Sequence, residues 1–329
     1  MSGASLSSDK HLVLVAPNWL GDVIMAQPAM RAFAMNHNGK ITICGKAWLA
    51  DLLPFLHLNS AAFSAEIPHA DRVVLFPNSF SSAWRAWKSG TSRRIGFSGQ
   101  WRSPLLRPAL TPRFDMLTEH HRDYYLDLAE QSGVPISERE VALSLPDTEI
   151  ENGKALLARH GLDAAKTICV APGAQFGGAK RYPSESYAIV MQHLSEAGWQ
   201  LMVLGTAAER EIGEASLQHV RIGWNAAGQT SLREALQIIA ATQILLCNDS
   251  GLMHVAAGMN KPVVAIFGAT APYRTRPSGK HLHLLYHPAN CSPCLQRECT
   301  VPGQPCMANV TPELVLNECF AALEQTGKT

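Results

Sequence analysis

The chain has 329 residues, of which 47% are hydrophobic, so it can bury more than one core, and its length favours two domains over a single small module. Its 28 basic and 27 acidic side chains leave a formal net charge of +1, which excludes a general electrostatic attraction to nucleic acid. We therefore expect no nucleic-acid partner, and an anionic ligand would have to meet a local group of basic side chains.

The sequence contains no run of 18 apolar residues, and its first ten residues lack the charged and apolar regions of a signal peptide. These features predict a cytoplasmic protein. Its eight cysteines are then expected to stay reduced.

Short apolar runs alternate with helical patterns in the first half of the chain. We expect a glycine to end the last helix of this half, at Gly133, and Pro28 to kink the first. The segment 134–147 carries proline and charge and is interpreted as the interdomain region. The expected strands are 11–16, 40–44 and 72–76, and the expected helices are 22–36 and 119–132.

A second alternating series follows the interdomain region. Two such series predict an α/β fold of two doubly wound Rossmann-like domains facing a cleft, with domains at residues 1–150 and 151–329. The expected strands of the second series are 167–171, 200–204, 244–247 and 263–267, and the expected helices are 184–197, 208–217 and 232–241.

The run from Asn248 to Gly268, NDSGLMHVAAGMNKPVVAIFG, predicts a strand exit, a helix start and a buried strand. Free amides at such a helix start suit a phosphate, and Asp249 could accept sugar hydroxyls. Equally, Asp249 and Ser250 could simply cap the helix. His254 lies one turn further along, as a buried helix residue or as part of the same site.

The glycine-rich segment Pro172–Arg181, PGAQFGGAKR, also follows an expected strand and resembles a phosphate cradle. It lacks the Walker pattern, because Ala179 follows Gly178, so a P-loop NTPase is excluded. Lys180 or Arg181 could neutralise a diphosphate leaving group, or both could be solvated bases on a loop.

The loop after the first strand, Pro17–Asp22, has a single glycine, which disfavours a nicotinamide dinucleotide site. Asp22 is either a helix N-cap or a catalytic carboxylate, because the helix dipole stabilises the charge in both roles. The turn residues Gly205, Thr206 and Glu209 could border a nucleoside, but a purely structural role is favoured.

Between Asp71 and Asp115 the chain carries eight basic residues and no acidic one, with three tryptophans interleaved. This composition indicates either a solvated basic face or a surface for an anionic, partly apolar partner. The basic residues are Arg72, Arg85, Lys88, Arg93, Arg94, Arg102, Arg107 and Arg113, and the tryptophans are Trp84, Trp87 and Trp101.

Four cysteines, Cys291, Cys294, Cys299 and Cys306, lie in a proline- and glycine-containing stretch that predicts a loop. Four thiolates could close a tetrahedral zinc site, although the second pair lacks the spacing of a zinc ribbon. A redox or disulfide role and unliganded thiols stay open as alternatives.

Five segments together resemble the lipopolysaccharide heptosyltransferases, nearly from end to end of the chain. Within that family the similarity is greatest to the type II branch, which adds heptose to a heptose of the inner core. The segments are PNWLGDVIMAQ (17–27), FPNSF (76–80), RRIGFSGQWRSPLL (93–106), PGAQFGGAKRYP (172–183) and NDSGLMHVAAGMNKPVVAIFG (248–268).

The resemblance implies an inverting glycosyltransferase of the GT-B type that uses ADP-L-glycero-β-D-manno-heptose and needs no metal or other cofactor. It implies an N-terminal acceptor domain and a C-terminal donor domain, with Asp22 as the base and Lys180 assisting the leaving group. The expected donor-binding residues are Gly21, Pro172, Gly173, Ala174, Lys180, Arg181, Asp249, Ser250, Gly251 and His254, and the expected acceptor-binding residues are Asn18, Trp19, Asn78, Arg93 and Arg94.

The family pattern usually has tryptophan where Tyr182 stands, a mild departure. The expected partners are ADP-heptose, the lipopolysaccharide inner core and, peripherally, the cytoplasmic face of the inner membrane. The alternatives are a type I enzyme acting on Kdo2-lipid A, a GT-B nucleotide-sugar epimerase and a non-catalytic ADP-sugar sensor.

Overall fold

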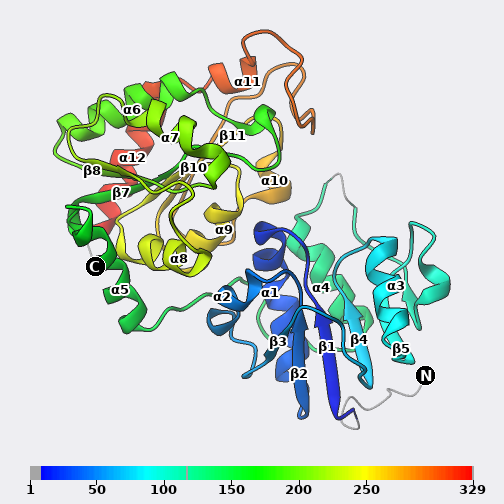
Figure 1. Cartoon of the computed structure of the whole chain (residues 1–329). Coiled ribbons are helices and arrows are strands. Elements are labelled where there is room, and N and C mark those ends of the chain that lie inside the picture. Colours follow the sequence, from blue (N-terminus) through cyan, green and yellow to red (C-terminus); the bar gives the residue numbers. More distant parts are fainter. Residues whose placement is uncertain (1–8, 116–117, 328–329) are drawn as a thin grey trace. The chain divides into compact units, whose positions relative to one another are not determined.

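The short apolar runs of the sequence form the strands of two parallel six-stranded sheets (Figure 1). The computed structural model describes residues 9–115 and 118–327. The chain divides into two compact units at residues 1–143 and 144–329, a boundary that lies inside the expected interdomain segment. The expected domain boundary between residues 150 and 151 would instead divide helix α5 (Asp147–Arg159).

The sheet of the first unit has the strand order β3-β2-β1-β4-β5-β6, and β1 pairs in parallel with both β2 and β4. The order reverses at β1 and β4, and in such sheets ligands bind outside the carboxyl ends of the strands at this point of reversal. The strands are β1 (His11–Val15), β2 (Lys40–Cys44), β3 (Ala62–Ser64), β4 (Arg72–Leu75), β5 (Arg93–Phe97) and β6 (Ala109–Leu110).

Helices cross between these strands, as parallel pairing requires. The longest, α1, runs unbroken through Pro28, so the proline does not interrupt it. The helices are α1 (Leu20–Met35), α2 (Leu49–Leu52), α3 (Phe80–Lys88) and α4 (His121–Gln131), with 3-10 turns η2 (Leu53–Phe55) and η3 (Ser103–Leu105).

The second unit repeats this plan, with the strand order β12-β11-β10-β7-β8-β9 and the reversal at β7 and β10. Its strands are β7 (Thr167–Ala171), β8 (Gln200–Val203), β9 (Gly223–Asn225), β10 (Leu245–Asn248), β11 (Val263–Phe267) and β12 (Leu282–Tyr286). Its helices are α5 (Asp147–Arg159), α6 (Ser184–Glu196), α7 (Arg210–Leu217), α8 (Leu232–Ala241), α9 (Gly251–Gly258), α10 (Pro272–Thr275), α11 (Pro305–Ala308) and α12 (Pro312–Thr326), with 3-10 turns η4 (Ala164–Lys166), η5 (Gly178–Lys180) and η6 (Ala207–Glu209).

The expected strands and helices all form, with ends that differ by a few residues. The sequence did not predict five strands. Three of them, β3, β6 and β9, have only two or three residues, β5 begins with two arginines, and β12 is a largely apolar run that was missed. Among the described residues (9–115 and 118–327), no helix is both long and apolar enough to cross a membrane.

Helix α5 packs closely on α8 because Gly153 lacks a side chain. A Cβ atom at this position would overlap the backbone carbonyl of Gln237 in α8. Glu149, one turn earlier, accepts hydrogen bonds from Arg233 and Gln237 of the same helix. Both bonds lower the pKa of Glu149, and the bond from Arg233 has the larger effect.

We predict that Gly153→Ala destabilises the protein. Alanine in a helix normally gains about 0.5–1 kcal/mol over glycine, but overpacking against rigid backbone costs about 1–3 kcal/mol. Thermal unfolding should therefore begin at a lower temperature. The control is Asn152→Ala on the exposed face of α5, which should match or slightly exceed the wild type. An unchanged or raised melting temperature for Gly153→Ala would contradict the close packing.

Candidate active site

In the first unit, Asp22 lies in the first turn of α1, directly after the loop that leaves β1. The N-cap of α1 is Trp19 and it makes no side-chain capping bond, so the N-cap interpretation of Asp22 is wrong. Tyr125 of α4 has a pKa well above its usual value, mainly because it is buried and in addition because the negative charge of Asp22 disfavours its ionisation. The Asp22 carboxylate therefore lies near α4. The indole of Trp19 is half exposed beneath the ammonium of Lys46.

The loop after β4 carries Asn78, which is exposed. A buried guanidinium, that of Arg102, fixes this loop: it donates to the carbonyls of Pro77 at 2.5 Å and Ser79 at 3.3 Å. It also donates to Phe97 O at 2.8 Å, at the end of β5. Arg102 thus joins the two loops that follow β4 and β5, a role that the sequence did not reveal.

The acid-free segment between Asp71 and Asp115 does not form one continuous basic face, because Arg72, Arg94 and Arg102 are buried. Arg94 was expected to bind an acceptor, but its guanidinium donates to the carbonyls of Leu105, Thr91 and Ser92. These bonds tie β5 to its neighbouring loops and direct the charge into the unit, so Arg94 offers no surface cation here. Arg93 was also expected to bind the acceptor, but it starts β5 and so lies at the edge of the sheet opposite the loops that follow β1 and β4. Its side chain is about one-third exposed, and its guanidinium lies 3.9 Å from the Asp9 carboxylate.

In the second unit, Asn248 at the end of β10 connects the predicted donor loops. Its amide nitrogen donates to Pro172 O at 2.6 Å and to Gly173 O at 3.2 Å. Its amide oxygen accepts from Tyr182 N at 3.1 Å and from the Tyr187 hydroxyl at 3.0 Å. A wholly buried side chain thereby brings the glycine-rich segment to the loop that starts α9.

Lys180 and Asp249 form an ion pair, with Nζ to Oδ2 at 2.6 Å. Asp249 is buried and also accepts from the Thr270 hydroxyl, in the loop after β11. Ser250 is the N-cap residue of α9 but makes no side-chain capping bond, so the interpretation of these two residues as simple helix caps is wrong. Gly251 starts the helix, and His254 is buried within it.

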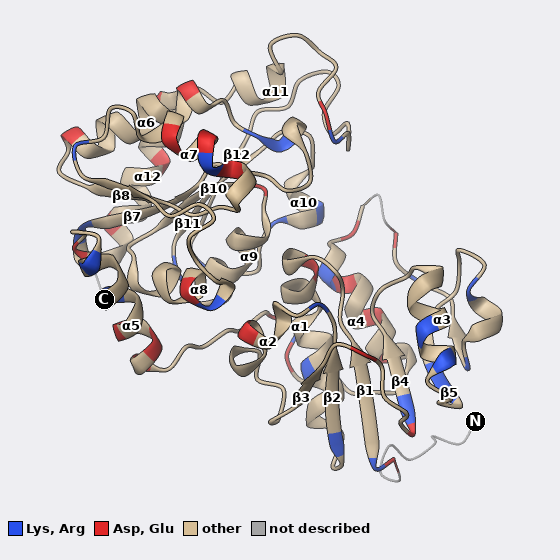
Figure 2. Ribbon diagram, viewed as in Figure 1, with Lys and Arg blue, Asp and Glu red and all other residues tan. Residues whose placement is uncertain are grey.

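Two arginines at the same edge of this sheet have buried nitrogens without a protein partner. The Nε atoms of Arg181, after β7, and Arg274, in α10 after β11, make no hydrogen bond within the described residues. Figure 2 shows basic residues on α10. Together with Lys180 these side chains give the edge a cationic character that can bind an anion.

Glu209 has a structural role, as the sequence favoured. Its carboxylate accepts from the backbone and hydroxyl of Thr206 and completes a capping box at η6. A Cβ atom on Gly173 would overlap this carboxylate, so the glycine allows the loop after β7 to pass close to η6. Ala174, the next residue, is buried in the same loop.

The loop that contains the four cysteines binds the glycine-rich segment directly. Ala179 N donates to Arg297 O at 2.9 Å, and Gly178 N donates to Glu298 Oε1 at 3.1 Å. Gln304 Nε2 donates to Ala179 O at 2.9 Å and to Gly178 O at 3.2 Å. The loop therefore determines the path of the chain that leads to Lys180.

The cysteines of this loop are free thiols in the structure, so no disulfide links them. Within the described ranges, no three His, Cys, Asp or Glu side chains are grouped closely enough to hold a metal ion. Cys306 is buried, and this burial raises the pKa of its thiol.

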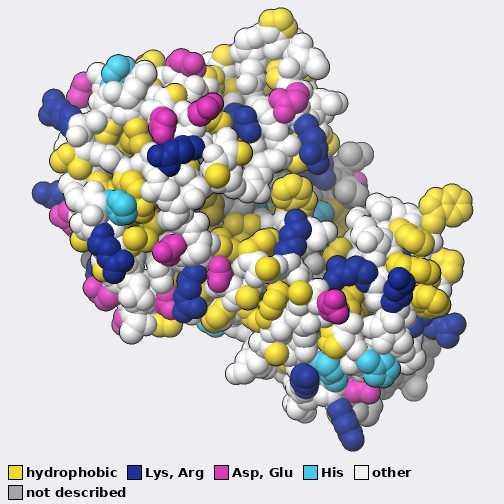
Figure 3. Space-filling model, in the orientation of Figure 1, with side chains coloured by type: hydrophobic (Ala, Val, Ile, Leu, Met, Phe, Trp, Pro, Cys, Tyr) yellow, Lys and Arg dark blue, Asp and Glu magenta, His cyan; other side chains and the backbone are white. Residues whose placement is uncertain are grey.

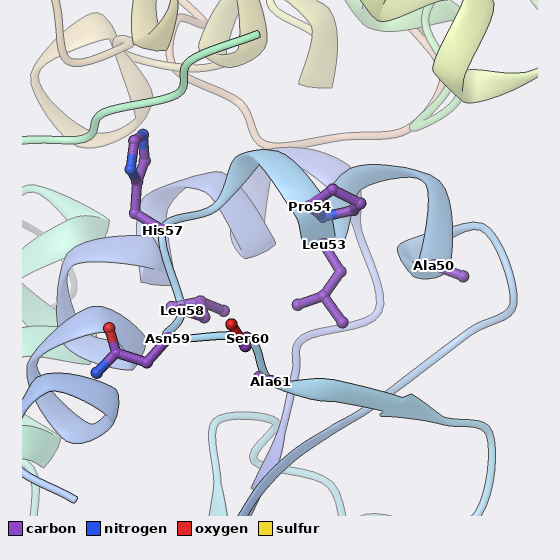
Figure 4. A pocket seen from close by; sticks show the side chains of 8 residues that line it. All are labelled: Ala50, Leu53, Pro54, His57, Leu58, Asn59, Ser60 and Ala61. Atoms are coloured by element: carbon purple, nitrogen blue, oxygen red, sulfur yellow. The ribbon is translucent and has the colours of Figure 1, made fainter. Parts of the chain in front are cut away.

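A cavity of about 380 Å³ in the first unit lies apart from the predicted site residues, none of which lines it (Figure 4). It is bounded by η2 and the turn that enters β3, at the edge of the sheet opposite the loops described above. Its lining residues are Ala50, Leu53, Pro54, His57, Leu58, Asn59, Ser60 and Ala61.

Comparison with known proteins identifies the family of the chain. Residues 66–304 match the model of glycosyltransferase family 9 (heptosyltransferase). The chain is 28% identical to lipopolysaccharide heptosyltransferase 2 of Salmonella typhimurium, over 96% of this chain and 99% of that protein. It is 27% identical to lipopolysaccharide heptosyltransferase 2 of Escherichia coli K12, over 95% and 99% of the two chains.

The structure is similar to that of the E. coli ADP-heptose LPS heptosyltransferase II, with a TM-score of 0.80 and 27% identity. The match covers 96% of this chain and 99% of that one. The two-domain α/β fold expected from the sequence is therefore confirmed as that of the GT-B heptosyltransferases.

We predict that Gln304→Ala loosens the glycine-rich segment, because two carbonyls of that segment lose their side-chain donor. Hydrogen exchange of the amides at 177–180 should become several times faster, with little change in global stability. Gln192→Ala is the matched control, since this partly exposed glutamine donates to Glu196 within α6. Unchanged exchange at 177–180 in Gln304→Ala would show that the other contacts of the loop suffice.

Proposed function

Because the chain belongs to glycosyltransferase family 9, the heptosyltransferases, we propose that it moves L-glycero-D-manno-heptose from ADP-heptose to a heptose of the lipopolysaccharide inner core. The observation that carries this choice is the similarity, over almost the whole chain, to two proteins named lipopolysaccharide heptosyltransferase 2. No metal or other cofactor is part of the proposal.

The donor diphosphate would bind at the carboxyl edge of the second sheet. The backbone amides at the start of α9 and the side chains of Lys180 and Arg181 supply the donors and charge that a diphosphate requires. Lys180 now pairs with Asp249, so its ammonium is already held at this edge. On binding, it would stabilise the negative charge that develops on ADP as the sugar leaves, while Asp249, Ser250 and His254 line the same edge.

Asp22 would act as the general base. Its carboxylate takes the proton of an acceptor hydroxyl while that oxygen attacks the anomeric carbon of the heptose. The bond from this carbon to the diphosphate breaks at the same time, ADP departs with the electron pair, and the configuration inverts. The dipole of α1 keeps a carboxylate in its first turn ionised and ready to accept a proton.

The acceptor would meet the loops that follow β1 and β4 in the first unit. Asn18, Trp19 and Asn78 are the residues proposed for it. Arg93 is left out because it starts β5, at the edge of the sheet opposite these loops. Arg94 is left out of this set because its guanidinium bonds to backbone carbonyls. We place the enzyme at the cytoplasmic face of the inner membrane, where a lipid-anchored acceptor is presented.

The test of the proposal is a transfer assay with ADP-heptose and two purified acceptors, one with no heptose and one with a single heptose. We expect product only with the acceptor that carries one heptose, and no reaction of ADP-heptose without an acceptor. Transfer to the heptose-free acceptor would instead assign the type I reaction. ADP-heptose that is converted without acceptor would contradict a transferase.

We predict that Asp22→Asn lowers kcat by at least about a hundredfold, because the amide cannot take the proton. Its effect on stability should be small, about 0.3–1 kcal/mol from the lost charge at the helix start. Asp51→Asn is the matched control, since Asp51 also lies in the first turn of a helix in the first unit. Near-normal turnover of Asp22→Asn would exclude this carboxylate as the base.

A further inference from the structure

Helix α3 carries three exposed aromatic side chains that stack on one another. Phe80 and Trp84 have ring centroids 6.3 Å apart, and Trp84 and Trp87 have centroids 4.9 Å apart. Their exposed fractions are 46%, 39% and 47%. Their spacing of four and three residues places them on one face, while Ala83 and Ala86 of the same helix are buried. We call these three side chains the aromatic ladder.

A fourth aromatic residue lies close to the start of this helix. Trp101 is 93% exposed, and its backbone has a positive φ of 60°. The next residue, Arg102, donates to the carbonyl of Ser79, the N-cap of α3. The turn that carries Trp101 is therefore anchored beside the first residue of the ladder. Exposed hydrophobic side chains gather over α3 at the edge of the molecule in Figure 3.

The ladder is accompanied by positive charge. Lys88 Nζ lies 5.4 Å from the ring centroid of Trp84, and Arg85 is exposed on the same helix. Figure 2 shows Lys and Arg on α3 and no Asp or Glu there. Arg107 and Arg113, further along the acid-free segment, are exposed as well. The surface thus combines large aromatic rings with cations, without acidic residues between Asp71 and Asp115.

We propose that the aromatic ladder of α3, with Trp101 and Lys88, docks the enzyme on an anionic lipid bilayer. Tryptophan and phenylalanine lie favourably at the boundary between head groups and acyl chains, and lysine beside them is attracted to acidic head groups. A wholly aqueous anion would explain the cations but not four exposed aromatic rings. The ladder also begins two residues after Asn78, so the proposed acceptor loop would lie at the lipid surface.

This inference rests on the proposed transfer to a lipid-anchored acceptor, yet it can be tested apart from it. The full chain is floated with vesicles of phosphatidylcholine alone or of phosphatidylcholine mixed with phosphatidylglycerol. We expect binding to the mixed vesicles, weakened as the Debye length falls from about 10 Å at 0.1 M salt to about 3 Å at 1 M. Absent binding, or equal binding to both kinds of vesicle, would overturn the proposal.

The double variant Trp84→Ala, Trp87→Ala should reduce binding to the mixed vesicles about tenfold or more, since the bilayer then loses two rings that it would bury. The matched control is Ile189→Ala, Phe320→Ala, because these side chains are 46% and 39% exposed in the second unit. Lys88→Gln should weaken binding about fivefold, and Lys280→Gln, at an exposed position of the second unit, should not. Equal loss in variant and control would contradict a specific surface.

Transfer assays separate this surface from the chemistry. With a water-soluble acceptor from which the acyl chains have been removed, the Trp84→Ala, Trp87→Ala variant should match the wild type. With acceptor embedded in mixed vesicles it should be slower. Vesicle binding without any heptose transfer would reject the proposed function alone. Light scattering of the wild type and the variant tests whether the ladder instead holds two copies of the chain together. A dimer that the Trp84→Ala, Trp87→Ala variant loses would reject the docking proposal.

Discussion

The candidate donor site depends on one buried amide, the side chain of Asn248. Both of its polar atoms are used: the nitrogen binds the carbonyls of Pro172 and Gly173, and the oxygen accepts from Tyr182 and Tyr187. A buried polar group without partners would be costly, so this arrangement permits one path for the loop after β7. That path brings Lys180 to Asp249, and thus sets where the charge of the site lies.

The sequence predicted the loops that carry the site because strand exits have a local signature: an apolar run, then glycine, asparagine or aspartate. It could not predict which basic residues remain at the surface. Arg94 and Arg102 have the same local composition as their exposed neighbours, but Arg94 donates to the carbonyl of Leu105 and Arg102 to that of Pro77, both distant in the sequence. Only the tertiary structure reveals these acceptors, so the basic face was overestimated. The roles of Asp22 and Lys180 remain predictions.

The polar contacts of the second unit also explain why the cysteine-containing loop was hard to interpret. Cysteine spacing directs attention to metal and redox chemistry, whereas the contacts made by this loop come from Arg297, Glu298 and Gln304. A backbone carbonyl, a carboxylate and an amide that bind another loop leave no pattern in a single sequence. With the four thiols free, these contacts give the loop a supporting function for the glycine-rich segment.

Gly177 and Gly178 of the glycine-rich segment restrict how this part of the chain can be altered. A Cβ atom at Gly177 would overlap the carbonyl of Arg297, and one at Gly178 would overlap the carboxylate of Glu298. The two loops are therefore complementary in shape, like parts of one interface. A chimaera that takes residues 289–306 from a relative should take residues 172–183 with them, because either loop transplanted alone would meet a partner shaped for another sequence.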